Sequence, residues 1–170
     1  MKRLRTAARR SAAVALPFGF LTVVYWLTVL APLAVKADYI DGMAAYDGGD
    51  FQTAFEEWRP LAAQGDADAQ VALAGLYAEG SGVPANPAMA LYWYRRAAEA
   101  GHAVAQLNLG DFLARGIGAP RDLVGAYVWL SLAARQGRAW PELRRRDVAA
   151  RMSPTQLREA KARLKAWRRE

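Results

Sequence analysis

Apolar residues in the middle of the chain recur at helical spacing in two successive segments. Within residues 67–78 they form one stripe along a helix, made of Ala69, Ala72, Leu73 and Leu76. Within residues 87–100 they follow the i, i+4, i+7, i+8 spacing, at Ala90, Tyr94, Ala97 and Ala98. Because most of these side chains are small, two helices with such stripes can approach each other closely. The pattern predicts a pair of packed amphipathic helices.

Turn-forming residues mark the ends of both predicted helices. Gly80 lies just past the first helix, where a left-handed residue commonly ends a helix. Asn86 is the expected N-cap of the second helix, and Pro87 suits its first position because an N–H would have no partner there. Gly101 ends the second helix. We expect Pro60, which falls late in an earlier helix, to kink or end that helix.

The predicted helix pair belongs to a repeat of 36 residues, a period marked by Gly65, Gly101 and Gly137. Residues 65–100 and 101–136 share 13 identical positions, and Trp93 matches Trp129 in that register. A pair of helices of this size cannot bury its apolar face alone. Neighbouring pairs are therefore expected to stack into a superhelix.

The same register explains a glycine-rich segment and extends toward the N-terminus. The turn at residues 80–84 recurs at residues 116–120, with both glycines and the proline in place. A phosphate-binding loop of the dinucleotide type needs a strand before it and a third glycine. We therefore interpret residues 80–82 as a structural turn. Residues 50–65 match residues 86–101, which predicts a degenerate front half-unit within residues 38–66.

The segments AQVALAGLYAEGSGVPANPAMALYWYRRAAEAG and AQLNLGDFLARGIGAPRDLVGAYVWLSLAARQG resemble the Sel-one-like repeat family, a branch of the tetratricopeptide-type helical repeats. The resemblance covers residues 50–137, with two full repeats at residues 67–137. One departure is Asp-Phe-Leu at residues 111–113 where the preceding unit has Gly-Leu-Tyr. The resemblance implies an all-α fold, a short right-handed α-solenoid of antiparallel helix pairs. It also implies protein–protein interaction as an adaptor or scaffold, with no catalytic residues.

Residues 1–37 have the pattern of an export signal. A basic start is followed by residues 11–35, which carry no charge, and small residues precede Asp38. We expect a signal peptide cleaved after Ala37. An uncleaved membrane anchor is the alternative, since about 20 apolar residues suffice to span a bilayer. Both interpretations place the remaining chain across the membrane, in the bacterial periplasm or secreted, or tethered to the inner membrane.

Residues 138–170 are predicted to form a helical cap. One short helix is expected over residues 140–151. A second begins at Ser153, with Gln156 completing a capping box. Its apolar stripe is Leu157, Ala160, Leu164 and Trp167. A solenoid needs a terminal element with one polar face, and this helix suits that task.

Charge is distributed unevenly along the chain, whose formal net charge is +7. Residues 38–137 carry 12 acidic and 6 basic groups, whereas residues 138–170 carry 11 basic and 4 acidic groups. The basic cluster Arg144, Arg145 and Arg146 is a candidate partner-binding site. It could guide an acidic partner to the tail or favour weak head-to-tail self-association. A solvated helix face is the simpler interpretation.

Candidate chemistry is sparse. The chain has no cysteine and one histidine, His102, which we place in a solvent-exposed turn because its repeat equivalents are Asp66 and Arg138. Glu56 and Glu57 are about 100° apart on a helix and do not face each other. No catalytic, cofactor-binding or metal-binding residue is predicted, and no cofactor.

One member of the aromatic triplet at residues 92–94 remains open. Trp93 and Tyr94 recur as packing positions, but Tyr92 has no such explanation and is a second candidate partner contact. We expect an exported, non-catalytic scaffold or adaptor of the bacterial cell envelope that binds a protein or peptide and no nucleic acid. The alternatives are an enzyme accessory or inhibitor in the envelope, or an assembly factor anchored in the inner membrane.

Overall fold

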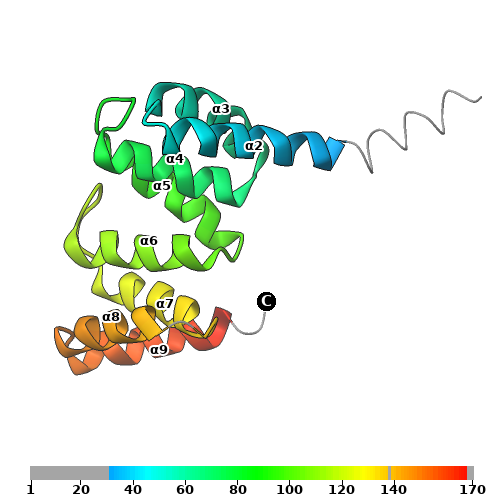
Figure 1. Cartoon of the computed structure of the whole chain (residues 1–170). Coiled ribbons are helices and arrows are strands. Elements are labelled where there is room, and N and C mark those ends of the chain that lie inside the picture. The colour runs from blue at the N-terminus through cyan, green and yellow to red at the C-terminus, as the bar shows by residue number, and fades with distance from the viewer. Residues whose placement is uncertain (1–30, 138, 168–170) are drawn as a thin grey trace, which may run out of the picture. The chain divides into compact units, whose positions relative to one another are not determined.

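The computed structural model describes residues 31–137 and 139–167, with side chains from Tyr39 onward. The chain divides after Val35, and the repeats lie in the second unit, Lys36–Glu170. Throughout the described residues the regular structure is helical, as the apolar pattern predicts. The helices are shown in Figure 1: α2 Ala31–Asp47, α3 Phe51–Gln64, α4 Ala67–Glu79, α5 Pro87–Glu99, α6 Ala103–Arg115, α7 Leu123–Ala134, α8 Ala139–Ala150 and α9 Pro154–Ala166.

The boundaries predicted for the middle helix pair are confirmed. Gly80 follows α4 in the left-handed conformation, with φ 77°, and its N–H donates to the carbonyl of Leu76. The side chain of Asn86 caps α5 by accepting a hydrogen bond of 3.1 Å from the N–H of Met89. Pro87 is the first residue of that helix. The local sequence therefore sets where each helix begins and ends.

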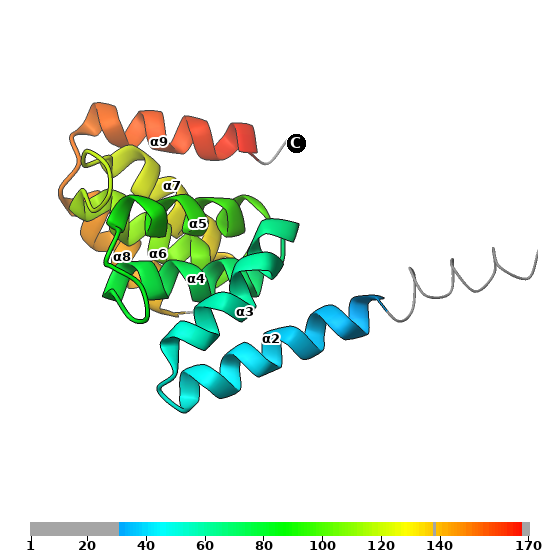
Figure 2. The same ribbon diagram turned by 90° about the horizontal axis from the view of Figure 1, so that it is seen from above.

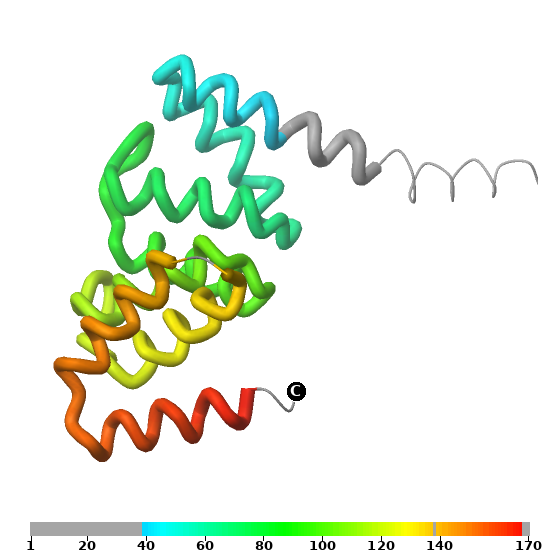
Figure 3. Tube along the Cα trace, turned by 60° about the horizontal axis from the view of Figure 1, so that its bottom comes forward, coloured from blue at the N-terminus to red at the C-terminus, as the bar shows by residue number. Residues whose placement is uncertain are grey.

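Helix pairs stack one upon the next along the chain. α4 packs on α5 and α6 on α7, while α5 packs on α6 and joins the two units. Figures 2 and 3 show this stacking from two further directions. Trp58, Tyr94 and Leu130 occupy equivalent positions 36 residues apart, and each is buried. The second unit of the chain is an α-solenoid, as expected.

A buried glutamine ties each inner unit to the unit before it. The side-chain amide of Gln70 donates to the carbonyl of Ala62, 3.0 Å away, near the end of α3. The amide of Gln106 donates in the same way to the carbonyl of Ala98, 3.2 Å away, near the end of α5. Both glutamines are almost fully buried. Each of these carbonyls lies in the last turn of a helix and also accepts a hydrogen bond from the N–H of the glycine that follows, Gly65 or Gly101.

The glycine-rich turns are explained by close contact with the preceding unit. Gly82 has φ +70°, and a Cβ placed on it would lie 2.5 Å from the backbone of Phe51 at the start of α3. Gly118 has φ +74°, and a Cβ placed on it would likewise collide with the backbone of Pro87 at the start of α5. Both positions require glycine for conformation and for space. The interpretation of residues 80–82 as a structural turn agrees with this geometry.

The front of the repeat domain is a helix pair, whereas the sequence predicted half a unit. α2 packs against α3 through Trp58, whose ring stacks on Tyr39 with centroids 5.9 Å apart and also contacts Tyr46. Gly42 allows this contact because a Cβ there would collide with the indole of Trp58. Tyr39, Met43 and Tyr46 follow helical spacing, which is the sequence pattern that could have revealed this helix.

Of the two effects expected of Pro60, a kink or an end of the helix, the second is wrong. α3 continues beyond Pro60 to Gln64. Leu61 and Ala62 are buried in the core and hold the last turn in place. Tertiary packing of these two side chains outweighs the hydrogen bond that proline removes from the helix.

The two C-terminal helices form as predicted, within one residue. Ser153 and Gln156 make the capping box at the start of α9. α8 keeps the repeat register, since Pro141 is buried at the position of Ala69 and Ala105. α9 packs on α7, where the ring of Trp167 meets Trp129 edge-on with centroids 4.9 Å apart. α9 therefore covers the last complete helix pair.

The export segment predicted for residues 1–37 lies outside the described residues, apart from the first seven residues of α2. α2 runs through the position at which cleavage is expected, between residues 37 and 38. Within the described part of the chain, none of the helices combines the length and apolar character that a membrane span needs.

Candidate functional site

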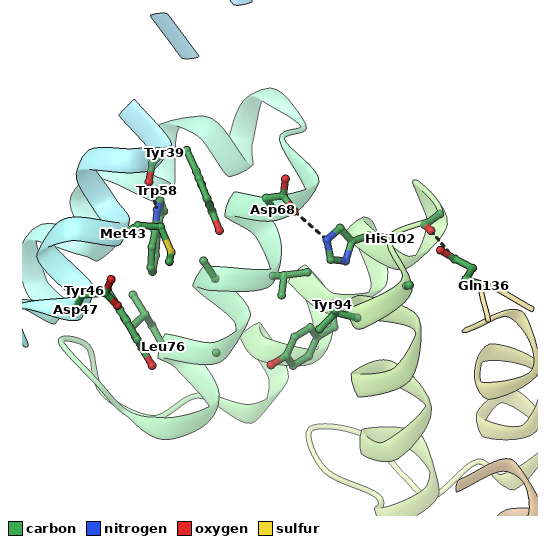
Figure 4. Close-up of a pocket in the computed structure, with 16 residues that line it drawn as sticks. Tyr39, Met43, Tyr46, Asp47, Trp58, Asp68, Leu76, Tyr94, His102 and Gln136 are labelled. Carbon is green, nitrogen blue, oxygen red and sulfur yellow. Dashed lines mark hydrogen bonds and ion pairs between the residues drawn. The ribbon is translucent and has the colours of Figure 1, made fainter. Parts of the chain in front are cut away.

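A groove of about 770 Å³ opens on the repeat domain. Its walls come from α2, α4 and α6, the first helices of three successive pairs, together with Trp58, Tyr94 and the turns at residues 101–102 and 136. Figure 4 shows the labelled side chains around it. The lining is mainly aliphatic and aromatic, with a few polar groups at one edge. Ligand-binding clefts in proteins commonly have this size and a lining of this kind.

The α2 wall is built from Tyr39, Met43, Tyr46 and Asp47. Its position is fixed from behind, because the indole N–H of Trp58 donates to the carbonyl of Tyr39 at 3.2 Å. Burial raises the pKa of Tyr39, and the negative charges of Asp68 and Asp66 raise it further. The Tyr39 hydroxyl therefore remains protonated at neutral pH and can donate a hydrogen bond.

The α4 wall contains Val71, Ala72 and Gly75. Gly75 lies inside a helix, where glycine costs about 1 kcal/mol relative to alanine. A Cβ at this position would have no neighbour within 4 Å, so packing does not require glycine here. The missing side chain leaves space in the groove. This position differs from the next unit, where the equivalent residue is Asp111.

The polar edge of the groove contains a histidine–carboxylate pair. Nε2 of His102 lies 2.9 Å from Oδ1 of Asp68, which links the start of α6 to α4 (Figure 4). Nδ1 of His102 accepts a hydrogen bond from the N–H of Ala105 and so caps α6. The two contacts together require the tautomer with its proton on Nε2.

His102 lies in the turn between two units, as predicted, but its side chain also makes contacts that the sequence did not reveal. Its side chain is 23% exposed, and it serves as an N-cap and as an inter-unit bridge. Asp66 caps α4 at the equivalent position of the preceding unit. The shared requirement of the position is a side chain that accepts a hydrogen bond at a helix start. Aligning Asp66 with His102 carried that information, because both can accept such a bond.

Tyr94 also lines the groove. Burial raises its pKa to about 12, and the charge of Glu79 adds to this effect, while a hydrogen bond with Asn108 opposes it. Its ring also packs edge-on against Phe112 of the next unit, with centroids 5.3 Å apart. Tyr94 is consequently a core residue with one face toward the groove.

The candidate contact Tyr92 lies outside the groove. Its side chain is 47% exposed, as expected for the member of the triplet that the repeat leaves unexplained. Its ring meets Trp93 edge-on, and its hydroxyl accepts a hydrogen bond of 3.2 Å from Arg96. Trp93 packs against the core, as predicted. Tyr92 remains a candidate on its own surface.

The candidate cluster Arg144, Arg145 and Arg146 also lies away from the groove, and its charges are paired within the chain. Arg144 bonds Asp111 of α6 at 2.8 Å. Arg145 makes two hydrogen bonds to Glu142. Arg146 bonds the same carboxylate at 2.9 Å, and its side chain is 70% exposed.

Arg145 also reaches α7, where it donates to the hydroxyl of Tyr127 at 2.7 Å and lies over the same ring. The hydrogen bonds to Glu142 and Asp111 raise the pKa of Arg145 and Arg144 respectively. Reversing all three arginine charges would thus break contacts of α8 with α6 and α7. Such a variant cannot separate partner binding from folding.

Within residues 31–137 and 139–167 there is no group of three or more histidine, aspartate and glutamate side chains that could hold a metal ion. The residues that line the groove were not singled out from sequence as binding residues. Several of them occupy positions that differ between units, such as Asp68 and Val104, so the repeat identities could not reveal these residues.

The chain is similar to known repeat proteins. A family scan matches the Sel1 repeat at residues 67–102 and 103–137. A crystal structure of a Sel1 repeat protein from Oxalobacter formigenes is 31% identical, with a TM-score of 0.63, and the match covers 74% of this chain and 98% of that one. The chain belongs to the Sel1 repeat family. Sel1 repeats commonly act as protein-interaction scaffolds.

A second Sel1-type structure extends the comparison. It is a protective antigen present in uropathogenic Escherichia coli strains, which displays an SLR fold. The antigen is 27% identical, with a TM-score of 0.74, and the match covers 78% of this chain and 29% of the antigen. This chain therefore spans less than a third of the antigen's length. A search of curated proteins found no match.

Proposed function

We propose that this Sel1 repeat protein binds another protein or a peptide in the groove between α2, α4 and α6, and acts there as a non-catalytic scaffold. The observation that carries the proposal is the groove itself. It combines an apolar lining, tyrosine hydroxyls and a polar edge on three stacked helices. Rigid helices hold these side chains in place before a partner arrives, which lowers the entropic cost of binding.

Gly75 offers a direct test. Gly75→Leu would place a side chain into the groove, where nothing lies within 4 Å of the Cβ position. Because leucine has the higher helix propensity, the variant should be more stable by up to about 1 kcal/mol. Loss of binding in a more stable protein could not be attributed to misfolding. Ala63→Leu is the matched control, since Ala63 is exposed on α3 and does not line the groove.

The readout is photo-crosslinking in intact cells, with the reactive group at Val104 on the groove edge or at Ala63 outside it. We expect a discrete adduct when the reactive group is at Val104. With the reactive group kept at Val104, this adduct should disappear in the Gly75→Leu variant and persist in the Ala63→Leu variant. Equal labelling from both sites would argue against the groove. An adduct that survives Gly75→Leu would do the same.

We also propose that the repeats act in the bacterial cell envelope. Support comes from the sequence of residues 1–37, which combines a basic start, an uncharged stretch of 25 residues (11–35) and small residues before Asp38. Fractionation of cells followed by intact-mass measurement tests this proposal. A periplasmic protein that starts at Asp38 would indicate a cleaved signal, and a full-length membrane-bound protein would indicate an anchor. A full-length protein in the cytoplasm would refute export.

A further inference from the structure

The charges around the groove have one sign. Asp47 and Asp68 line it, and no lysine or arginine is among the described residues that do so. His102, the one ionisable nitrogen base of the lining, has both ring nitrogens engaged, Nε2 with Asp68 and Nδ1 with the N–H of Ala105. The charges of Asp66 and Asp68 also reach the wall of the groove, where they raise the pKa of Tyr39. An apolar groove whose carboxylates have no lysine or arginine beside them attracts positive charge.

The two groove carboxylates differ from Asp111, an acid on the same helix face of the next unit. Asp111, which replaces Gly75 in the next unit, is paired with Arg144 at 2.8 Å. Within the described residues, neither Asp47 nor Asp68 forms an ion pair with a lysine or arginine. The side chain of Asp68 is 67% exposed although His102 occupies its Oδ1. Its second oxygen is therefore available to a ligand, and His102 fixes its orientation.

We propose that the occupant of the groove is a cationic, apolar segment of another protein. In this arrangement basic side chains of the partner pair with Asp68 at the polar edge and with Asp47 on the α2 wall, which lie apart in the groove (Figure 4). A neighbouring aliphatic or aromatic side chain fills the space above Gly75, against Val71 and Met43. This inference rests on the proposed use of the groove and adds the chemistry of the partner. The match of charge gives selectivity against acidic segments more than raw affinity.

The basic tail of a second copy is a less suitable occupant. Residues 138–170 have the required charge, but the apolar face of α9 is already used. Ala160 is fully buried, and Trp167 packs on Trp129 of α7. A tail that entered another copy's groove would have to leave this contact. A segment of a different protein has no such cost.

The test selects ligands without assuming them. Random linear peptides displayed on phage are selected on the immobilised full-length chain in mild detergent, with the Gly75→Leu variant as the counter-target. We expect enriched peptides to carry lysine or arginine next to an aliphatic or aromatic residue. Binding of one enriched peptide is then measured by fluorescence anisotropy against the wild type, Asp47→Asn/Asp68→Asn and Glu99→Gln. Asparagine at residue 68 keeps an oxygen for His102, and Glu99 is an exposed acid outside the groove.

The double asparagine variant should bind the peptide about five- to tenfold more weakly than the wild type, as expected for the combined loss of two exposed ion pairs. Glu99→Gln should bind the peptide like the wild type. Enriched peptides that avoid Gly75→Leu but lack basic residues would overturn the cationic partner and leave the groove as the binding site. Peptides that bind Gly75→Leu equally well, or no enrichment at all, would overturn both proposals. A concentration-dependent dimer in light scattering that Gly75→Leu abolishes would assign the groove to a second copy and overturn this inference.

Discussion

Oδ1 of Asp68 lies 2.9 Å from Nε2 of His102, and this contact joins two helices that are 36 residues apart in register. His102 thus caps its own helix and holds a carboxylate at the groove edge. The two tasks use different ring nitrogens. They can therefore be separated by substitution.

His102→Ala should lower the free energy of unfolding by about 1 kcal/mol, because the N-cap of α6 is lost. His102→Asn should restore most of this loss, since asparagine caps helices well but is too short to reach Asp68. Urea unfolding of the three proteins measures the difference. Equal destabilisation by alanine and asparagine would mean that the bridge to Asp68, and not the cap, stabilises the fold.

The repeated turn gives a prediction with an internal control. Gly101→Ala places a side chain at φ +90° with open space around it, which should cost about 1–2 kcal/mol. Gly82→Ala and Gly118→Ala combine a similar φ with a collision against the preceding unit, and each should cost about 1–3 kcal/mol more. Thermal or urea unfolding tests this order. Three equal losses would show that the turns do not depend on contact with the helix before them.

A buried glutamine carbonyl distinguishes the two inner units. Oε1 of Gln106 accepts a hydrogen bond of 3.1 Å from Gln136, whereas Oε1 of Gln70 is buried without a partner in the structure. The residue equivalent to Gln136 is Ala100. Ala100→Gln should therefore stabilise the fold by up to about 1 kcal/mol, and Gln136→Ala should destabilise it by about 1–2 kcal/mol.

Unfolding free energies of these two variants provide the measurement. Because the substitutions act at equivalent positions, opposite signs are expected. If Ala100→Gln leaves stability unchanged while Gln136→Ala lowers it, the Gln70 carbonyl is already satisfied, for example by an ordered water molecule.

Acid should loosen α8. Hydrogen bonds from Arg145 and Arg146 lower the pKa of Glu142 from 4.5 to about 2. A carboxyl group with a lowered folded-state pKa stabilises the fold above its unfolded pKa, and this stability is lost as the pH falls from 4.5 toward 2. Unfolding by urea at several pH values across this window measures the loss. The control is Glu142→Gln, whose stability should fall less over the same window, and parallel curves would contradict the assignment.

The helix boundaries of the inner repeats could be predicted from the sequence, because the local conformation and the contacts between units require the same residues there. The stripe that includes Leu73, the cap at Asn86 and the glycine at residue 80 each predict a boundary that the structure has. Gly82 shows the same agreement, since it serves both the turn and the contact with Phe51. A position at which both the local conformation and a contact between units require the same residue type is occupied by that residue in each inner unit. Such positions could therefore be predicted from the sequence.

Other features could not be predicted from the sequence, because they are caused by tertiary contacts that the pattern of apolar and polar residues does not show. Pro60 should disturb a helix in isolation, but buried Leu61 holds the turn that follows it. Arg144 and Arg145 look like free charges in the sequence, yet their partners lie on other helices or one turn away. The groove residues could not be predicted as binding residues for a different reason. Positions such as Gly75 and Asp111 vary between units, as surfaces that meet different neighbours do.

The docking of each glycine turn on the helix before it has a consequence for how such a chain can lengthen. The inner units have seven-residue connections, residues 80–86 and 116–122, whereas the end pairs have three-residue links, residues 48–50 and 151–153. An inner unit carries both the turn that docks and the helix start that receives the next turn. A tandem duplication of 36 residues would therefore supply the docking turn at one end and the helix start that receives the next turn at the other. It would add a first helix to the stack without altering the helix pair at either end.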